Sequence, residues 1–73
     1  MNPRMKLKAV RVENGDTQED AAKIINVSKE TYNQKELGKR DFTLTEAVKL
    51  AKYYKKTLDQ LFFDNSVNTN KTA

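Results

Sequence analysis

Apolar residues recur along this chain three and four positions apart, which is the spacing of an amphipathic α-helix. The clearest run lies in the second half of the chain, at Leu44, Ala47, Val48, Ala51 and Tyr54. Shorter runs repeat the spacing at Leu58, Leu61 and Phe62, at Ala21, Ala22 and Ile25, and at Leu7 and Val10. Because only two glycines and one proline interrupt 73 residues, helices joined by short turns are expected.

The pattern predicts an all-α domain with five helices, near residues 3–14, 18–25, 29–37, 44–54 and 58–63. Hydroxyl side chains mark the helix starts, at Thr17, Ser28, Thr43 and Thr57. Each threonine is followed three residues on by Asp, Glu or Gln, which is the capping-box pattern. Gly15 and Gly38 suit the left-handed turn that ends a helix, and Asn26 is the next-best residue for one.

Beyond Phe63 the chain is polar and lacks helical periodicity. Residues 1–63 are therefore expected to form the folded domain, with 64–73 as a flexible C-terminal tail.

The predicted helix over 29–37 is polar nearly all round, with only Tyr32 and Leu37 as sizeable apolar groups. A buried stripe of its own cannot be what mainly holds such a helix in place. One interpretation is a solvated surface helix. The other is a binding surface, because Asn33 and Gln34 are side-chain types that read base edges in the major groove of DNA.

The surroundings of this helix favour the second interpretation. A tight Asn-Val-Ser turn joins it to an alanine-rich helix whose small side chains permit close approach. The basic pair Lys39-Arg40 follows it, where a phosphate-gripping loop would sit. Two helices around a short turn, the second one polar, describe a helix-turn-helix.

Composition narrows the chemistry that is available. The chain has no cysteine and no histidine, so disulfides, thiolate-bound zinc, imidazole ligands and the usual proton shuttle are absent. There is no glycine-rich phosphate loop, and we expect no enzymatic activity, metal, cofactor or small-molecule ligand. A net charge of +4 and a pI near 9.4 are compatible with binding to a polyanion, but they do not indicate which polyanion that is. No apolar run exceeds four residues, which predicts no membrane span and no signal peptide. The absence of cysteine fits the reducing conditions of the cytoplasm, which is the expected location.

A longer pattern runs through most of the chain. Its residues are Leu7, Val10, Arg11, Gly15, Thr17-Gln18-Glu19-Asp20, Ala22, Val27-Ser28, Glu36-Leu37-Gly38-Lys39-Arg40, Leu44, Leu50-Ala51 and Leu58-Asp59-Gln60-Leu61-Phe62. In these residues and their spacing, the chain resembles the Cro/repressor-type (Xre) helix-turn-helix family over about residues 4–63. The amino-acid sequence from Tyr32 to Ala47 is similar to that of small regulators of phages and prophages of Gram-positive bacteria.

The resemblance implies a role for each matching position. The base-contacting positions would be Ser28, Lys29, Glu30 and Gln34. The phosphate-contacting positions would be Thr17, Gln18, Asn33, Lys39 and Arg40. Arg11 and Glu36 match an ion pair that joins the first helix to the end of the third, the alternative being two independent surface charges. By residue chemistry, Lys29 favours guanine and Gln34 adenine, whereas Glu30 either accepts from cytosine or only excludes wrong sites.

A module of this size reads few base pairs, so useful specificity suggests a homodimer on palindromic double-stranded DNA. The expected dimer surface is the last helix and the residues just after it, with Leu58, Phe62 and Phe63 as candidates. The alternative for Phe63 is a local lid on the core. The resemblance and the shortness of the chain together imply a Cro-like repressor.

A second hypothesis from another class is an antitoxin-like or antirepressor-like module that binds protein on the same fold. In that case Tyr53, Tyr54 and Phe63 would be exposed and would dock the partner.

The chain also departs from the family pattern at several positions. Asp16 stands for leucine, Asn26 for glycine, Lys35 for a buried aliphatic residue, Phe42 for proline, and Lys55-Lys56 for Gly-Val. None lies on the expected reading face. They predict a less stable core in which two or three contacts are missing.

Overall fold

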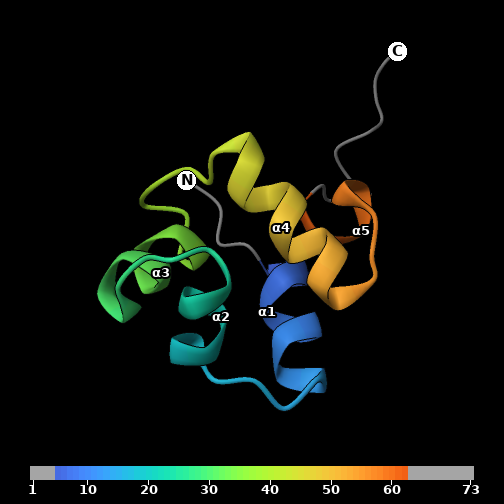
Figure 1. The fold of residues 1–73 in the computed structure, drawn as a ribbon, viewed down its shortest axis with the longest axis horizontal. Helices are drawn as coiled ribbons and strands as arrows, with labels where there is room; N and C mark the ends of the chain where they lie inside the picture. The colour runs from blue at the N-terminus through green and yellow to red at the C-terminus, as the bar shows by residue number, and fades with distance from the viewer. Residues whose placement is uncertain (1–4, 63–73) are drawn as a thin grey trace.

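The structure, a computed structural model, describes residues 5–62, which form five helices and no strand (Figure 1). The helices are α1 (Met5–Glu13), α2 (Gln18–Ile24), α3 (Lys29–Glu36), α4 (Leu44–Tyr54) and α5 (Leu58–Phe62). The predicted all-α fold is confirmed, and the helix-turn-helix pair ends one residue earlier in each helix than predicted. Residues 3 and 4, Phe63 and the predicted tail over 64–73 lie outside the described residues.

The helices enclose one core, with α1 contacting α3 and α5, and α4 contacting α2 and α5. The largest fully buried side chains come from four different helices: Leu7, Tyr32, Leu50 and Leu61. Leu44 fits the helical period of α4 but is not part of the core, because at the first turn of the helix it is 72% exposed. The buried face of α4 begins instead one turn later and ends at Tyr54.

All four predicted N-caps are present. Thr17 and Thr43 form complete capping boxes with Asp20 and Glu46. Thr57 forms the same reciprocal pair with the residue three positions on, and Ser28 Oγ accepts from the Thr31 amide at 3.1 Å. These bonds satisfy amides that the first turn of a helix leaves without an intrahelical partner.

The first four helices end in the same left-handed turn. Its residues are Gly15, Asn26, Gly38 and Lys55, with φ of +80°, +60°, +84° and +58°. After α3, for example, the Gly38 amide donates to the Lys35 carbonyl at 3.1 Å and the Lys39 amide donates to the Gln34 carbonyl at 2.9 Å. This pair of bonds is the Schellman motif. Lys55 was not predicted, because a lysine carries a Cβ that disfavours this conformation.

Replacing Lys55 with glycine is expected to stabilise the protein. The left-handed conformation costs an L-residue about 1–2 kcal/mol, more than the loss of about 0.5–1 kcal/mol that glycine brings through its unfolded-state entropy. For a domain of this size, a gain of 1 kcal/mol raises Tm by about 4–8 °C, so an increase of a few degrees is expected in thermal unfolding. Lys56→Gly is the matched control and should lower Tm, since Lys56 does not adopt a positive φ. Equal effects of the two changes would contradict this assignment.

The departures from the family pattern do not leave the predicted gaps in the core. The Tyr54 hydroxyl donates to Asp16 Oδ2 at 2.9 Å, so the aspartate has a partner in α4. The Phe42 ring packs edge-on against Tyr32 and Phe62, at centroid distances of 6.0 and 5.3 Å. Lys35 is buried and its ammonium is hydrogen-bonded. The prediction of missing core contacts is therefore wrong at Asp16, Lys35 and Phe42.

Candidate nucleic-acid interface

The close approach of α2 and α3 follows from small side chains and one sharp turn. Ala21 and Ala22 in α2 are buried, and α2 and α3 are in contact. Asn26 takes the left-handed conformation between the two helices, which reverses the chain within a few residues. Val27 is half-buried and packs against the core beneath the turn. Figure 1 shows the resulting pair on the opposite side of the molecule from α5.

The four predicted base-contacting residues lie at the start of α3 and along its outer side. Ser28, Lys29, Glu30 and Gln34 are all exposed. Glu30 and Gln34 are opposite the buried side of the helix, which carries Tyr32, Lys35 and Glu36. The placement of Glu30 and Gln34 follows from helical periodicity, since positions four apart share a face. Ser28 and Lys29 are exposed at the start of the helix.

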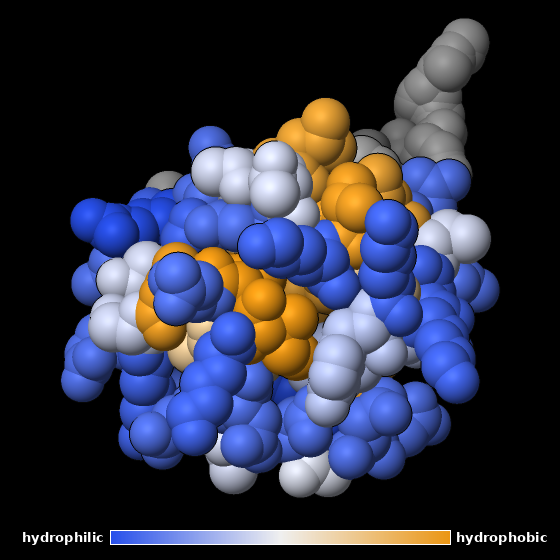
Figure 2. Space-filling view, viewed as in Figure 1, coloured by the Kyte–Doolittle hydropathy of each residue, from blue (hydrophilic) through white to orange (hydrophobic). Residues whose placement is uncertain are grey.

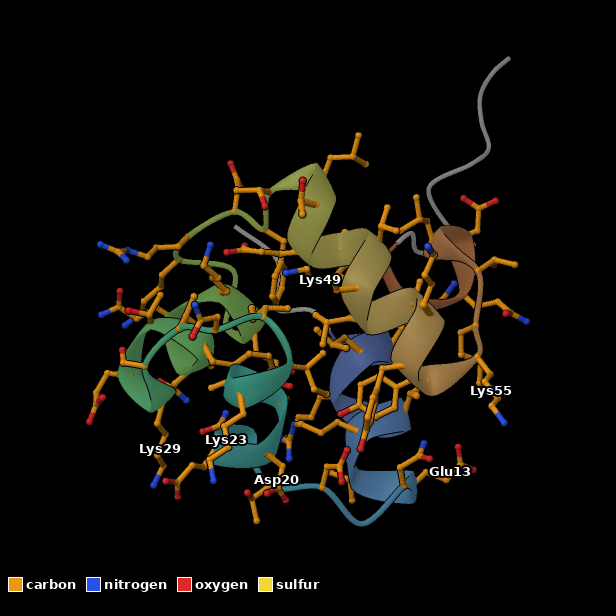
Figure 3. The ribbon with its side chains drawn as sticks, viewed as in Figure 1. Glu13, Asp20, Lys23, Lys29, Lys49 and Lys55 are labelled. Atoms are coloured by element: carbon orange, nitrogen blue, oxygen red, sulfur yellow. The ribbon has the colours of Figure 1, made fainter. Side chains whose placement is uncertain are left out.

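An open hollow of about 350 Å³ lies on the outer side of the α2–α3 pair. It is lined by Gln18, Lys29, Glu30, Asn33 and Gln34. Lys29 extends outward from the start of α3 (Figure 3). Hydrophilic residues cover this edge of the molecule, whereas apolar residues gather over the α2–α3 turn and at the start of α4 (Figure 2). The structure therefore brings together base-facing and phosphate-facing candidates from two helices.

Gln18, the first residue of α2, is held by two side chains of α3. Its Nε2 donates to Glu36 Oε1 at 3.1 Å, and its Oε1 accepts from Asn33 Nδ2 at 3.2 Å. These bonds fix the orientation of the Gln18 amide. Its Nε2 carries a second hydrogen, as every primary amide does, which leaves a donor for an external acceptor. Asn33, predicted to contact phosphate, is half-buried and turns its amide toward Gln18.

The remaining phosphate candidates lie at the two ends of the helix pair. Thr17 is exposed at the N-cap of α2, where its Oγ1 accepts from the Asp20 amide. Lys39 and Arg40 are exposed on the connection between α3 and α4. Their amides share one acceptor, the Gln34 carbonyl, at 2.9 and 3.3 Å.

A buried ion pair anchors α3 to the rest of the fold. Arg11 in α1 and Glu36 at the end of α3 pair in bidentate geometry, with Nε–Oε2 at 2.8 Å and Nη2–Oε1 at 3.1 Å. The Tyr32 hydroxyl donates to Glu36 Oε2 at 2.7 Å. Arg11 Nη1 also donates to the Asp16 carbonyl at 2.8 Å, which ties the α1–α2 turn to the same pair. Both charged residues are buried, so they fix the orientation of α3 from its buried side.

The charge states of this network are set by its contacts. Burial alone would raise the pKa of Glu36, but hydrogen bonds from Arg11, Tyr32 and Gln18 outweigh it, and the pKa is lowered. The hydrogen bond to Glu36 raises the pKa of Arg11. Burial raises the pKa of the Tyr32 hydroxyl, and its bond to Glu36 adds to the effect. At neutral pH the carboxylate and guanidinium are therefore charged, and Tyr32 is a proton donor.

Acid is expected to destabilise the protein. The pKa of Glu36 and that of Glu46, which is bonded to Lys35 and Thr43, are both below the ordinary value of 4.5. A depressed carboxyl pKa stabilises the fold fully above pH 4.5, and this stabilisation is lost as the pH falls through the lower folded value. Urea unfolding should therefore give a nearly constant free energy from pH 7 to 5 and a falling one below pH 4.5. A free energy that rises between pH 5 and 3 would contradict these pKa directions.

The candidate dimer residues are partly used by the core of the single chain. Leu58 and Phe62 are half-buried and pack against the core. Phe63 lies outside the described residues. The expectation that Tyr54 is an exposed docking residue is wrong, because Tyr54 is 5% exposed, whereas Tyr53 is 55% exposed.

Residues 5–62 were also searched for the side-chain clusters that bind metal ions and for helices that could cross a membrane. In that range no three Asp or Glu side chains converge as metal ligands, and the full sequence supplies no histidine or cysteine. No helix in the same range combines the length and apolar character needed to cross a membrane.

Reasoning from the sequence missed two partners of this site. Tyr32 precedes Glu36 by four residues, so the helical period itself gives the signal for their contact. Asn33 and Gln18 are 15 residues apart on different helices, and no local pattern joins them.

Comparison with known families agrees with this geometry. The chain matches the helix-turn-helix family over residues 7–61, which includes all five helices almost completely. Among curated proteins no match is found. The matched range contains the α2–α3 pair, the buried Arg11–Glu36 anchor and the connection that carries Lys39 and Arg40. The chain therefore belongs to the Cro/Xre-type helix-turn-helix family of DNA-binding transcription regulators.

Proposed function

We propose that this protein is a Cro-like repressor that binds a palindromic operator as a homodimer, with α3 in the major groove. The observation that carries the proposal is the exposed side of α3, where Lys29, Glu30 and Gln34 meet Gln18 in one open hollow. Behind that surface the helix is fixed by the buried Arg11–Glu36 pair. A rigid helix with a polar outer face is what direct reading of base edges requires.

Each side chain has a role in this proposal that follows from its position and chemistry. Lys29 and Gln34 supply donors and acceptors suited to guanine and adenine. Ser28 and Glu30 flank Lys29, and Glu30 accepts from cytosine or repels unsuitable sequences. Thr17 and Gln18 at the start of α2 face one phosphate, assisted by the partial positive charge of the helix end. Lys39 and Arg40 hold the phosphates on the other side.

Two copies are needed for useful specificity, because one module of this size contacts few base pairs. On a palindrome the two α3 helices enter successive major grooves about 34 Å apart. Phe63 and the exposed parts of Leu58 and Phe62 are the proposed dimer contacts. Repression results when the bound dimer blocks polymerase in the cytoplasm. We also propose that the protein is encoded by a phage or prophage.

In vitro selection from random duplex DNA tests the proposal. Wild type should enrich a palindromic site, and Gln34→Ala should relax the preference at one position of each half-site by about 1–3 kcal/mol. Lys29→Ala and Lys52→Ala form a charge-matched pair, since both lysines are exposed but Lys52 lies in the last turn of α4. Only the first should change the recovered sequence.

Two results would count against the proposal. Enrichment that is unchanged in both Lys29→Ala and Gln34→Ala would remove α3 as the reading helix. A folded protein that enriches no site would favour the protein-binding module instead, for which Tyr53 is the exposed aromatic residue among 5–62.

A further inference from the structure

Lys35 is buried on the inner side of α3, at a position where the family pattern has an aliphatic residue. Its side chain is 9% exposed. Lysine is seldom buried to this extent unless its charge is paired, because removing an ammonium from water is costly. The DNA-reading surface does not include this residue, so its charge has another use.

The ammonium of Lys35 joins three consecutive parts of the structure. The Lys35 side chain belongs to α3, and its Nζ donates to the Asp41 carbonyl, in the connection between α3 and α4, at 2.9 Å. It also donates to Glu46 Oε1, in the first turn of α4, at 2.8 Å. The ring of Phe42 lies 5.7 Å from the nitrogen. One side chain therefore holds both ends and the middle of this connection.

The connection is the segment that carries the exposed Lys39 and Arg40. At its start, the amides of both residues bond to the Gln34 carbonyl at the end of α3. At its end, the Thr43 amide donates to Glu46 Oε1 at 3.0 Å, and α4 begins. Between these points Lys35 binds the Asp41 carbonyl. An aliphatic side chain would fill the same space but would leave the connection without this bond.

We propose that Lys35 is a positioning residue that fixes the α3–α4 connection, so that Lys39 and Arg40 reach DNA phosphates together. This inference rests on the proposed function, in which those two residues grip the backbone. Lys35 itself does not contact DNA, because its ammonium is turned inward and is bound to Asp41 and Glu46. It acts on affinity for all sequences and leaves the choice of bases unchanged.

The test compares variants of known net charge on mixed-sequence duplex DNA, for which phosphate contacts supply essentially all of the affinity. Lys35→Met/Glu46→Gln removes one positive and one negative charge, so the net charge remains +4. Glutamine at position 46 keeps an acceptor for the Thr43 amide, as in other capping boxes. Lys39→Ala/Arg40→Ala is the reference for a connection without its basic pair. Lys52→Met is the control for an exposed lysine elsewhere.

The readout is the slope of log K against log salt concentration. Each lost phosphate contact reduces its magnitude by about 0.9, so the reference variant should lose about 1.8 per bound chain. Lys35→Met/Glu46→Gln should lose about 0.9 to 1.8, and combining it with the reference changes should add nothing further. Amide hydrogen exchange should accelerate at residues 39–43 and remain as in wild type in α1 and α2. A general loss of stability would instead accelerate exchange in all helices.

The outcomes separate the two proposals. If the reference variant loses its slope and Lys35→Met/Glu46→Gln keeps it, Lys35 has no positioning role and the proposed function stands. A Lys35 variant that loses slope further in the reference background would act through a contact of its own, which also overturns the inference. If neither variant changes the slope, the connection does not hold DNA, and both the inference and the phosphate contacts of the proposed function fail.

Discussion

Replacing Glu36 with alanine is expected to lower the free energy of unfolding by about 3–5 kcal/mol, the usual result of removing one partner from a buried ion pair. The change leaves Arg11, 6% exposed, without a carboxylate and removes the acceptor of the Tyr32 hydroxyl. At about 0.05–0.15 kcal/mol per residue, a 73-residue chain has only about 4–11 kcal/mol of stability. The loss is therefore a large share of the total stability, and the midpoint of urea unfolding should shift to a much lower urea concentration.

Urea unfolding followed by circular dichroism measures this effect, and a double variant gives the control. Arg11→Met/Glu36→Leu replaces both charges with apolar side chains, which is often neutral for a buried pair. It should regain most of the loss, although the Tyr32 hydroxyl and the Asp16 carbonyl still lack their partners. A loss below 1 kcal/mol in Glu36→Ala would show that the pair does not anchor α3.

Replacing Lys39 and Arg40 together with alanine is expected to reduce affinity for duplex DNA by more than about a hundredfold. Hydrogen bonds to charged groups contribute about 1.5–3 kcal/mol each, and 1.4 kcal/mol corresponds to a factor of ten. The loss should be the same for every DNA sequence, because phosphate contacts carry no base information. Thermal stability should barely change, since both side chains are exposed and such substitutions usually shift stability by less than about 0.5 kcal/mol.

Fluorescence anisotropy with a selected duplex and a mixed-sequence duplex checks this expectation. The ratio of the two affinities should remain as in wild type while both affinities fall. A variant that loses affinity only for the selected duplex would assign Lys39 and Arg40 to base reading. Unchanged affinity for both would remove the connection from the interface.

The local signals in the sequence were sufficient to predict the helices and their starts. Thr17, Thr43 and Thr57 cap helices because the hydroxyl and the acceptor three residues on lie within one turn of chain. The turns at Gly15, Asn26 and Gly38 were predictable for the same local reason, that these residue types tolerate a positive φ. Lys55 shows the limit of this reasoning, because a lysine takes the same left-handed conformation, with φ of +58°, at the end of α4.

The contacts that position the candidate site were less predictable because they join distant parts of the chain. The resemblance to a known family suggested the Arg11–Glu36 pair across 25 residues, and the two side chains do meet. Nothing local predicted that Asp16 would bind Tyr54, 38 residues away. The sequence around Lys35 likewise does not indicate its partner, because Glu46 lies 11 residues further on, in the next helix.

Which apolar residues of α4 are buried depends on where along the helix the neighbouring helices lie, and the sequence pattern does not contain this information. Leu44 fits the helical period of α4 but lies at its first position, beyond the reach of the other helices. Periodicity assigns a residue to a face of a helix and does not say where along the helix the core ends. Leu44 therefore fits the period without being buried, whereas Tyr54, at the other end of α4, is buried and its hydroxyl donates to Asp16 in the α1–α2 turn.

In the proposed complex, the outer side of α3, the start of α2 and the α3–α4 connection together form the surface that contacts duplex DNA. An NMR titration of isotope-labelled protein with short duplex DNA tests this placement most directly. The largest amide shift changes are expected at residues 17–18, 28–34 and 39–40, with little change around Val12 and Tyr53. Changes centred on Val12 and Tyr53, or none at all in a folded protein, would contradict this placement.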